Sequence, residues 1–320
     1  MGYNMKENDN IKSSNIRISV VMTTYNGERY LIQQLNSIAY QTKKADEVLI
    51  FDDCSTDSTV QLIKDFINNN KLSNWYLFTN KINLGWRKNF IQGISKAKGD
   101  IIFLSDQDDI WMKNKIERMS YIMSENEKIL ILSCNVRMKN DENMQLKVKR
   151  AVPKYKSKKL EKVQLNGSTY RPIRPGCAYA FKKEVIPEIE RLWFEGLAHD
   201  SLIWVIGLIK ESLYILNEPL VIQVRHAGNN TPTNEKTRKR RKELLDSRKE
   251  LSVHLLNNIQ YMSDRSQTWI RTYIHAAESR ILFLQEGGMF RYINLLRYIR
   301  YYPKFASWFG DYIAFRNKGV

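Results

Sequence analysis

The chain has few cysteines, no long apolar run and no signal-peptide pattern, and each absence excludes a class of protein. Its three cysteines, Cys54, Cys134 and Cys177, are far apart and form no CxxC pair, so neither a disulfide framework nor a structural zinc site is expected. The first fifteen residues are polar, and no run of about eighteen apolar residues is present to cross a bilayer. We therefore expect a protein of the reducing cytoplasm that meets a membrane only at its surface.

Positive charge is unevenly distributed along the 320 residues, whose formal net charge is +17. Residues 1–125 hold 16 basic and 15 acidic side chains, a net charge of +1, whereas residues 126–320 hold 35 and 19, a net charge of +16. The basic part favours an anionic partner such as lipid headgroups, nucleic acid or an anionic polymer. Hydrophobic residues make up 43%, which is enough to bury a sizeable core.

Short β-rich runs alternate with helical patterns from residue 17 onward. Strands are predicted at 17–24, 47–53, 75–79, 100–106, 128–134 and 218–226, and helices at 28–41, 55–69, within 83–99, at 113–124 and at 199–211. This alternation with short connections predicts an α/β fold whose mostly parallel sheet is covered by helices. In such sheets, ligands bind at the carboxyl ends of the strands.

Changes in composition predict three parts. Residues 1–16 form a polar, flexible tail, residues 17–235 a sheet-containing domain, and residues 236–320 a basic helical extension. Within the sheet domain, residues 137–174 are irregular and basic, which is typical of a surface loop.

Three carboxylates, Asp106, Asp108 and Asp109, come at the end of the strand predicted at 100–106. Their mutual repulsion at the end of a buried strand is costly unless solvent or a cation relieves it. Asp106 and Asp108 can share Mg²⁺ or Mn²⁺, which prefer oxygen ligands. The alternative is an acidic turn in which Asp109 caps the helix predicted at 113–124.

Polar residues also end the first two predicted strands. Asp52 can accept a hydrogen bond from a nucleotide base or a ribose hydroxyl. The alternative is a helix start, in which Ser55 or Thr56 caps the helix predicted at 55–69 and Asp52 and Asp53 lie near its dipole.

The segment TTYNGE at 23–28 ends at the same edge of the predicted sheet. Tyr25 can stack on a base, and Thr23 or Asn26 can form a hydrogen bond to it. Taken alone, the segment is also an ordinary turn between a strand and a helix.

His199 and Asp200 begin an apolar helix, and His226 ends the strand predicted at 218–226. Asp200 is either the cap of its helix or a general base that reaches a hydroxyl group. His226 is either structural or a ligand.

Four segments in order, SVVMTTYNGERYLIQQLNSIAYQT, VLIFDDCSTDST, NLGWRKNF and GDIIFLSDQDDIW, together resemble the family 2 glycosyltransferases with a GT-A fold. The segments RPGCAYAF, AHDSLIW and EPLVIQVRHAGNN extend the similarity to about residue 230. Within that family the chain is most similar to the bacterial rhamnosyltransferase-like branch, which builds cell-surface polysaccharides.

The resemblance implies inverting transfer of a sugar from a nucleoside-diphosphate donor, linked to dTDP or UDP, to a glycan or a lipid-linked acceptor. The implied residues are Thr23, Tyr25, Asn26, Asp52, Lys88 and Asp106 for the donor, Asp106, Asp108 and His226 for Mn²⁺ or Mg²⁺, and Asp200 as the catalytic base. Ser201 and Leu202 stand where relatives that look rhamnose-specific often carry aromatic residues, so rhamnose and a UDP-linked hexose both stay open as the donor sugar.

Residues 287–320 combine basic and aromatic side chains, which is typical of a membrane interface. We therefore predict a cytoplasmic enzyme that lies on the inner face of the cell membrane. A tail that packs as core or forms a homodimer interface is the alternative.

Two other functions fit parts of the sequence. The run KTRKRRK at 236–242 resembles an electrostatic footprint for nucleic acid, although no RNA-binding signature is present and no nucleic acid is expected. A nucleotidyltransferase also places metal-binding carboxylates on an α/β sheet, but it releases pyrophosphate.

Overall fold

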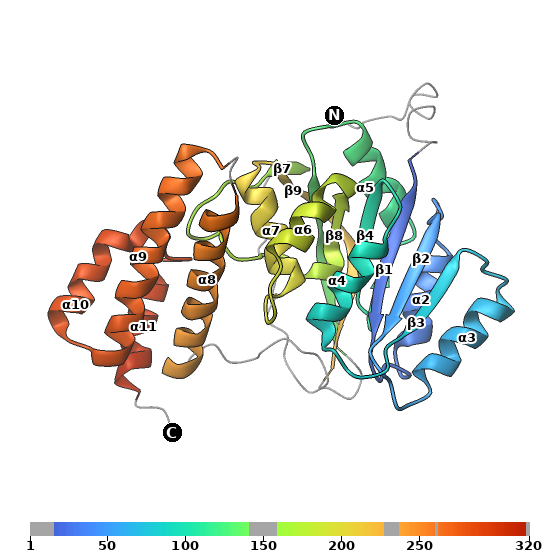
Figure 1. Ribbon diagram of the computed structural model, residues 1–320, viewed down its shortest axis with the longest axis horizontal. Coiled ribbons are helices and arrows are strands. Elements are labelled where there is room, and N and C mark those ends of the chain that lie inside the picture. The colour runs from blue at the N-terminus through green and yellow to red at the C-terminus, as the bar shows by residue number, and fades with distance from the viewer. Residues whose placement is uncertain (1–15, 141–158, 227–236, 260–261, 318–320) are drawn as a thin grey trace. The chain divides into compact units, whose positions relative to one another are not determined.

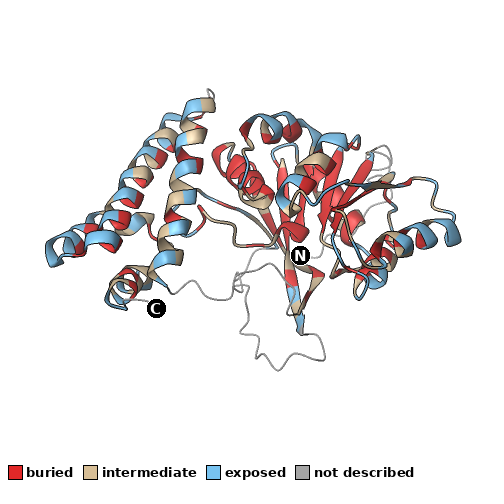
Figure 2. Cartoon of the chain, turned by 60° about the horizontal axis from the view of Figure 1, so that its bottom comes forward, coloured by how far each residue is buried: buried red, intermediate tan, exposed pale blue. Residues whose placement is uncertain are grey.

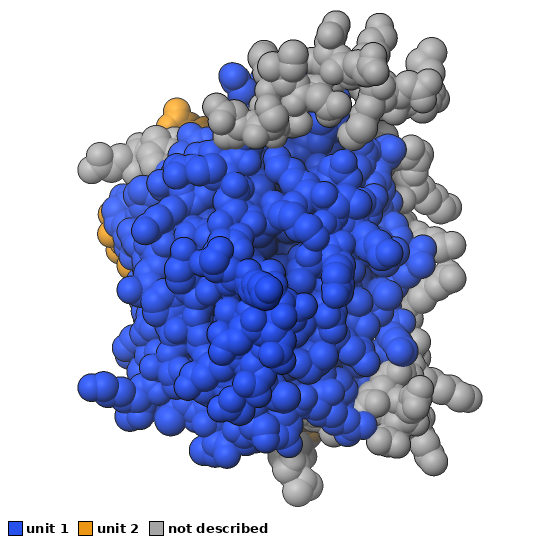
Figure 3. Space-filling view, turned by 90° about the vertical axis from the view of Figure 1, so that its right-hand side faces the viewer, with its two compact units in different colours: residues 1–163, 173–203, 212–227 blue, residues 164–172, 204–211, 228–320 orange. Residues whose placement is uncertain are grey.

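The computed structural model describes residues 16–140, 159–226, 237–259 and 262–317 (Figure 1). The chain forms two compact units, which Figure 3 distinguishes by colour. The first comprises residues 1–163, 173–203 and 212–227, and the second comprises 164–172, 204–211 and 228–320. The second unit thus includes two segments that the sequence alone places in the sheet domain. The predicted tail at 1–16 lies outside the described residues except for its last residue.

The first unit contains a nine-stranded sheet in the order β3-β2-β1-β4-β8-β6-β9-β5, with β7 paired to β9. Its strands are β1 (Ile18–Thr24), β2 (Glu47–Asp52), β3 (Trp75–Thr79), β4 (Ile101–Ser105), β5 (Asp109–Trp111), β6 (Ile131–Asn140), β7 (Leu160–Lys162), β8 (Tyr179–Lys182) and β9 (Leu213–Arg225). Strands β1 to β4 are mutually parallel, as the sequence predicts. Beyond β4 the sheet is mixed, because β8 runs antiparallel to both β4 and β6, whereas β6 and β9 are parallel.

Helices pack against the sheet, with α4 (Trp86–Lys96) on β1 and β2 and α3 (Thr59–Asn69) on β3. The others are α2 (Leu31–Ala39), α5 (Lys115–Ser124), α6 (Ile186–Leu192) and α7 (His199–Ile209), whose residues from 204 onward belong to the second unit. Every residue of β1 is buried, and successive residues of a strand face opposite sides of the sheet, so neither face of β1 is open. Asn89 of α4 is fully buried and donates to the carbonyl of Phe51 at 2.8 Å, which fixes α4 against β2.

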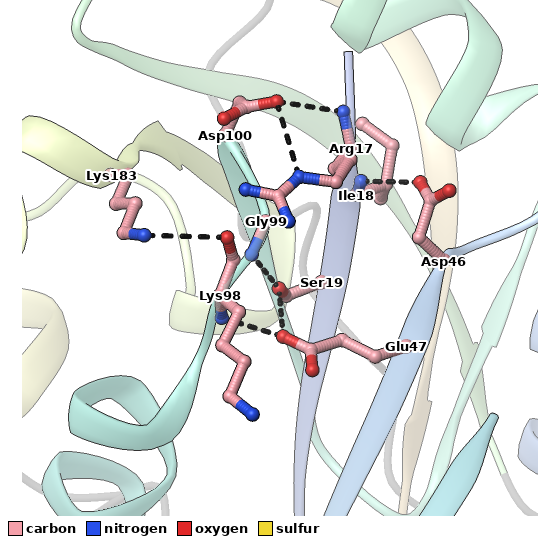
Figure 4. Close-up of polar contacts among 9 residues, drawn as sticks. All are labelled: Arg17, Ile18, Ser19, Asp46, Glu47, Lys98, Gly99, Asp100 and Lys183. Carbon is pink, nitrogen blue, oxygen red and sulfur yellow. Dashed lines mark hydrogen bonds and ion pairs between the residues drawn. The ribbon is translucent and has the colours of Figure 1, made fainter. Parts of the chain in front are cut away.

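Side-chain hydrogen bonds join the amino ends of the parallel strands (Figure 4). The backbone N–H of Arg17 donates to Asp100 at 2.9 Å, and the Ser19 hydroxyl donates to Glu47 at 2.6 Å. The Ser19 oxygen also accepts from the N–H of Gly99 at 2.7 Å. These bonds hold the amino ends of β1, β2 and β4 together.

The second unit is helical, with α8 (Arg238–Asn258), α9 (Asp264–Glu286), α10 (Met289–Asn294), the 3-10 segment η4 (Leu295–Tyr301) and α11 (Ala306–Arg316). Thr237 and Ser263 cap α8 and α9, since each side chain accepts a backbone N–H of the first turn. Buried and exposed residues alternate along these helices in Figure 2, as in helices that bury one face. No described helix of the chain is long and apolar enough to cross a membrane.

A buried ion cluster holds three of these helices together. Asp311 of α11 is fully buried and accepts from Arg241 of α8 at 2.8 Å. Arg280 of α9 donates to the same carboxylate from Nε at 2.8 Å and from Nη2 at 3.1 Å. The turn into α10 depends on Gly287, whose φ is +72° and whose added Cβ would lie 2.1 Å from the ring of Phe315. Only glycine fits there without displacing the ring.

The helices and strands predicted for β1 to β4 and α2 to α5 are confirmed, with ends that differ by a few residues. Two capping hypotheses are wrong. Asp109 does not cap α5, because it lies in β5 opposite Gln223 and the residue before α5 is Asn114. Helix α3 begins at Thr59, so neither Ser55 nor Thr56 is its cap.

Candidate active site

Asp52 ties the end of β1 to the turn after β2. It is fully buried and accepts from the Thr24 hydroxyl at 2.9 Å. The N–H of Ser55 donates to its other oxygen at 2.9 Å, and the Ser55 hydroxyl donates at 2.5 Å. These bonds fix the turn at the carboxyl edge of the sheet, and the predicted contact of Asp52 with a base stays a prediction.

Asp53 fixes the loop that leads into α4. The sequence predicts no role for this residue other than a place near the helix dipole. One carboxylate oxygen accepts from the Asn80 amide at 2.9 Å and from the N–H of Leu84 at 2.8 Å. The other accepts from the N–H of Gly85 at 2.8 Å. The first residues of α4 are thereby held beside the carboxyl ends of β2 and β3.

The turn after β1 is joined to the turn after β4. The N–H of Tyr25 donates to Gln107 Oε1 at 2.8 Å, and Gln107 Nε2 donates to the Tyr25 carbonyl at 3.0 Å. Asn26 accepts from the N–H of Thr56 at 2.8 Å, which adds the turn after β2. The Tyr25 side chain is exposed, whereas Thr23 is buried in β1. The structure therefore leaves the Tyr25 ring accessible for stacking.

Asp108 and His226 are 118 residues apart in sequence and meet at the carboxyl edge of the sheet. His226 Nε2 lies 2.7 Å from Asp108 Oδ2. The His226 ring is stacked on Tyr30 at 4.3 Å between centroids, which holds its orientation. Two of the three predicted metal ligands are thus brought together.

Asp106, Asp109 and Cys177 form a second group beside this pair, with ligand atoms within 4.8 Å of one another. Burial raises the pKa of Asp106 well above its usual range, and the nearby charges of Asp109, Asp108 and Asp200 raise it further. Burial also raises the pKa of Asp109 to about 7. Such shifts show that negative charge at this site is poorly compensated by the protein itself.

Lys115 is the buried cation nearest to these carboxylates in the described chain. Its Nζ donates to the carbonyl of Cys177 at 2.7 Å and lies 3.5 Å from the centroid of the Trp111 ring. Burial lowers the pKa of Lys115 to about 8, against the opposing effect of nearby acidic groups. Its charge counters part of the repulsion between Asp106 and Asp109.

Asp108 and His226 offer a carboxylate oxygen and a ring nitrogen, donors that a divalent cation accepts. Among the described residues, Asp106 is grouped with Asp109 and Cys177 rather than with this pair. Two adjacent ligands of an octahedral cation at about 2.1 Å stand roughly 3.0 Å apart, close to the 2.7 Å between His226 and Asp108. Burial raises the pKa of Cys177 well above its usual range, so this thiol stays protonated and is unsuited to such an ion.

Asp200 lies in the first turn of α7, close enough to Asp106 for its charge to raise the pKa of Asp106. One of its oxygens accepts from the N–H of Ser201 at 2.7 Å. The side chain is partly exposed, and burial raises its pKa while Ser201 and Arg87 oppose the rise. A raised pKa makes this carboxylate a stronger base than a solvated one.

Two basic residues at the start of α4 differ in their relation to Asp200. The charge of Arg87 acts on Asp200 and on His199. Lys88 is exposed, and its predicted contact with the donor phosphates stays a prediction. Arg87 is therefore a candidate site residue that the sequence analysis missed. Adjacent residues of a helix differ only in the direction that their side chains face, and the sequence does not show that direction.

His199 packs next to Asp200. Its ring is stacked on Phe90 at 3.9 Å and meets Trp86 edge-on at 5.6 Å. A Cβ on Gly176 would lie 3.0 Å from His199 Nε2 and 3.2 Å from Asp200 Cβ, which explains the glycine in RPGCAYAF. The tight contact fixes the start of α7 and hence the position of Asp200.

Parallel strands that end in a cluster of carboxylates, with a further aspartate at the start of a helix, agree with the GT-A fold. The sequence profile of glycosyl transferase family 2 matches residues 19–189, and the chain belongs to this family. It is therefore a glycosyltransferase.

Two relatives show where the similarity lies. The chain is 28% identical over 228 residues to the dTDP-rhamnosyl transferase RfbG of Shigella flexneri, a match that covers 67% of this chain and 74% of that protein. It is 32% identical over 119 residues to the poly(ribitol-phosphate) beta-N-acetylglucosaminyltransferase TarS of Staphylococcus aureus. That match covers 37% of this chain and only 20% of TarS, so the similarity is confined to one part of the larger protein.

Solved structures share the fold. S. aureus TarS 1–349 in complex with UDP-GlcNAc has a TM-score of 0.63 at 20% identity, over 88% of this chain and 80% of that one. The mannosyltransferase PcManGT from Pyrobaculum calidifontis, in complex with GDP-Man and Mn²⁺, has a TM-score of 0.56 at 17% identity, over 94% and 86%. At these identities the likeness concerns the fold alone.

Proposed function

We propose that this glycosyltransferase moves one sugar, with inversion, from a nucleoside-diphosphate donor to a hydroxyl of a glycan or lipid-linked acceptor in bacterial cell-surface polysaccharide synthesis. The observation that carries the proposal is Asp200, a carboxylate with a raised pKa that lies close enough to Asp106 for its charge to raise the pKa of Asp106. The name of the relative RfbG favours a dTDP-linked rhamnose donor, and that of TarS favours a UDP-linked hexosamine.

The donor nucleotide would bind at the carboxyl ends of β1, β2 and β4. The exposed ring of Tyr25 offers a stacking surface for the base, with Thr23, Asn26 and Asp52 around it. Asp106 would contact the ribose. The rigid turns described above, joined by bonds between Tyr25 and Gln107, favour a binding surface that exists before the donor arrives.

Asp106, Asp108 and His226 would hold Mn²⁺ or Mg²⁺. When bound, such an ion acts as a Lewis acid that neutralises charge on the donor diphosphate. The three carboxylates of the acidic turn favour this role, because a cation relieves the repulsion that raises the pKa of Asp106. Arg87, or the predicted Lys88, would add positive charge on the side of α4.

Asp200 would take the proton from the acceptor hydroxyl as its oxygen attacks the anomeric carbon. The bond from that carbon to the diphosphate oxygen breaks on the opposite face, and the electron pair leaves with the nucleoside diphosphate. One displacement inverts the configuration. Ser201 holds Asp200 through its N–H at 2.7 Å, and Leu202 is fully buried, so neither position offers an aromatic surface to the sugar.

The proposal is tested with purified protein, Mn²⁺ or Mg²⁺, and a panel of dTDP- and UDP-linked sugars, measuring nucleoside diphosphate released with and without acceptor. We expect Asp200→Asn to keep donor binding in calorimetry while turnover falls by roughly 10²–10⁴-fold, the usual contribution of a positioned base. Asp108→Ala should lose the metal-dependent part of donor binding. Asp65→Asn, an exposed aspartate of α3, is the matched control.

Near-normal turnover of Asp200→Asn would sink the assignment of the base. Release of pyrophosphate would instead identify a nucleotidyltransferase. Binding to nucleic acid that falls steeply with salt, without donor binding, would favour the nucleic-acid alternative.

A further inference from the structure

The last helices of the second unit carry exposed apolar side chains. On α10, Met289, Phe290 and Ile293 are exposed, whereas Tyr292 is buried. On α11, Phe305, Phe309 and Ile313 form a similar stripe, at intervals of four residues. We call these side chains, with Leu296 and the exposed basic residues Arg291, Arg297, Arg300, Lys304 and Arg316, the tail surface.

The apolar stripes are not needed for the core of the unit. That core consists of Phe283, Tyr292 and Leu295, with Trp308, Tyr312 and Phe315 packed against it. Phe290 is 79% exposed, and Ile293 is 54% exposed. Leu282, Met289 and Phe290 line one groove, and exposed apolar groups gathered in this way mark an interaction surface.

The charge of the tail surface is of one sign. Between residues 287 and 317 the sequence contains one acidic residue, Asp311. That carboxylate is fully buried and bound by Arg241 and Arg280. Every exposed ionised side chain of residues 287–317 is therefore basic, although Arg291 also pairs with Glu286 just before this segment.

A groove between α9 and α10 belongs to the same surface. It has a volume of about 570 Å³ and is lined by apolar residues that include Leu282, Met289 and Phe290, beside Arg297 and Tyr298. Aromatic and arginine side chains together suit the depth of lipid headgroups, where one end of the side chain is apolar and the other is wet.

We propose that the tail surface docks on an anionic phospholipid bilayer, with its apolar stripes entering the headgroup region and its basic side chains pairing with lipid phosphates. A second copy of the chain fits less well, since a two-fold contact would set basic side chains against basic side chains. The inference is compatible with the proposed lipid-linked acceptor but does not rest on the donor chemistry.

The test is sedimentation of the full chain with vesicles of phosphatidylcholine alone or mixed equally with phosphatidylglycerol. We expect binding to the anionic vesicles that weakens with salt, and little binding to the neutral ones. Ile293→Ser should lower the partition coefficient roughly tenfold, because the lost methyl groups no longer enter the interface. Ile82→Ser, at a residue of the first unit that is 66% exposed, is the matched control and should not change it.

A pair of charge reversals separates the contribution of basic side chains on the tail surface from the effect of the protein's net charge. Arg297→Glu should lower partition by about fivefold for each unit of charge, whereas Lys64→Glu on α3 changes the net charge equally and should have little effect.

Equal binding to both kinds of vesicle, equal effects of Ile293→Ser and Ile82→Ser, or absence of sedimentation would overturn the proposal. A dimer in analytical ultracentrifugation that Ile293→Ser dissolves, without vesicle binding, would identify a dimer interface instead. Release of nucleoside diphosphate by Ile293→Ser is measured in solution as well, so that a failure of membrane binding is distinguished from a failure of glycosyl transfer.

Discussion

His199 should make the folding stability depend on pH in a way that one substitution isolates. Its ring is 4% exposed, and neither nitrogen has a hydrogen-bond partner among the described residues. Burial, together with the charge of Arg87, lowers its pKa from 6.5 to about 3. The folded protein therefore keeps a neutral imidazole at pH values where the unfolded chain binds a proton.

Because the folded-state pKa is the lower one, the stability is fully present above about pH 6.5 and is lost as the pH falls toward about 3. A pH of about 5 is roughly 1.5 units below the pKa of the imidazole in the unfolded chain. Each unit corresponds to about 1.4 kcal/mol, so the expected loss in the free energy of unfolding is about 2 kcal/mol. A folded-state pKa one unit higher gives nearly the same loss, since the folded imidazole is neutral at pH 5 in either case.

Urea unfolding of the wild type and of His199→Leu at about pH 7.5 and pH 5 measures this contribution. Leucine is close to histidine in volume and does not titrate. All other titrating groups are common to both proteins, so the difference between their pH dependences isolates His199. We expect the wild type to lose about 2 kcal/mol more than the variant over this interval. The same pH dependence in both proteins would refute a buried, neutral His199.

Three further results are expected. Asp311→Asn should lower the free energy of unfolding by about 3–5 kcal/mol in thermal or urea denaturation, because it leaves the buried Arg280 and the partly buried Arg241 without their partner. The change Asp246→Asn, at a partly exposed ion pair, should cost about 0.5 kcal/mol or less. Similar values for the two variants would refute the buried cluster. Gly287→Ala should lower the melting temperature more than Gly196→Ala, because both have a positive φ but only the first places Cβ inside an aromatic ring. In native protein a thiol reagent should modify Cys54 rapidly and the two buried cysteines only after unfolding, and three equally fast thiols would contradict this burial.

The parallel half of the sheet could be predicted because each of its strands is a run of apolar residues between turn signals. Strand β5 could not, since it has only three residues, Asp109–Trp111. Its partner residues Val221 to Gln223 lie more than a hundred positions later, so no local pattern indicates the pairing. Strand β7 is also short and also pairs with distant residues of β9, from Leu160 with Leu216 to Lys162 with Tyr214.

The type of site could also be predicted, because carboxylates at strand ends are visible in the sequence. The burial of Lys115 could not. A lysine in an amphipathic helix is normally solvated, whereas this one is buried and donates a hydrogen bond to the carbonyl of Cys177, 62 residues later. Likewise the sequence places Arg87 and Lys88 side by side, and only the fold shows which charge acts on Asp200.

Burial also changes what the charge count of the tail means. The sequence gives residues 287–317 five basic residues and one acid. The acid, Asp311, is neutralised internally by arginines of α8 and α9, which lie outside this segment. An approaching partner therefore meets five exposed cations, of which Arg291 pairs with Glu286, beside apolar stripes that the core does not use. Nucleic acid would be attracted by the same cations, but it offers no interior for exposed aliphatic side chains, whereas the headgroup region of an anionic bilayer accommodates both.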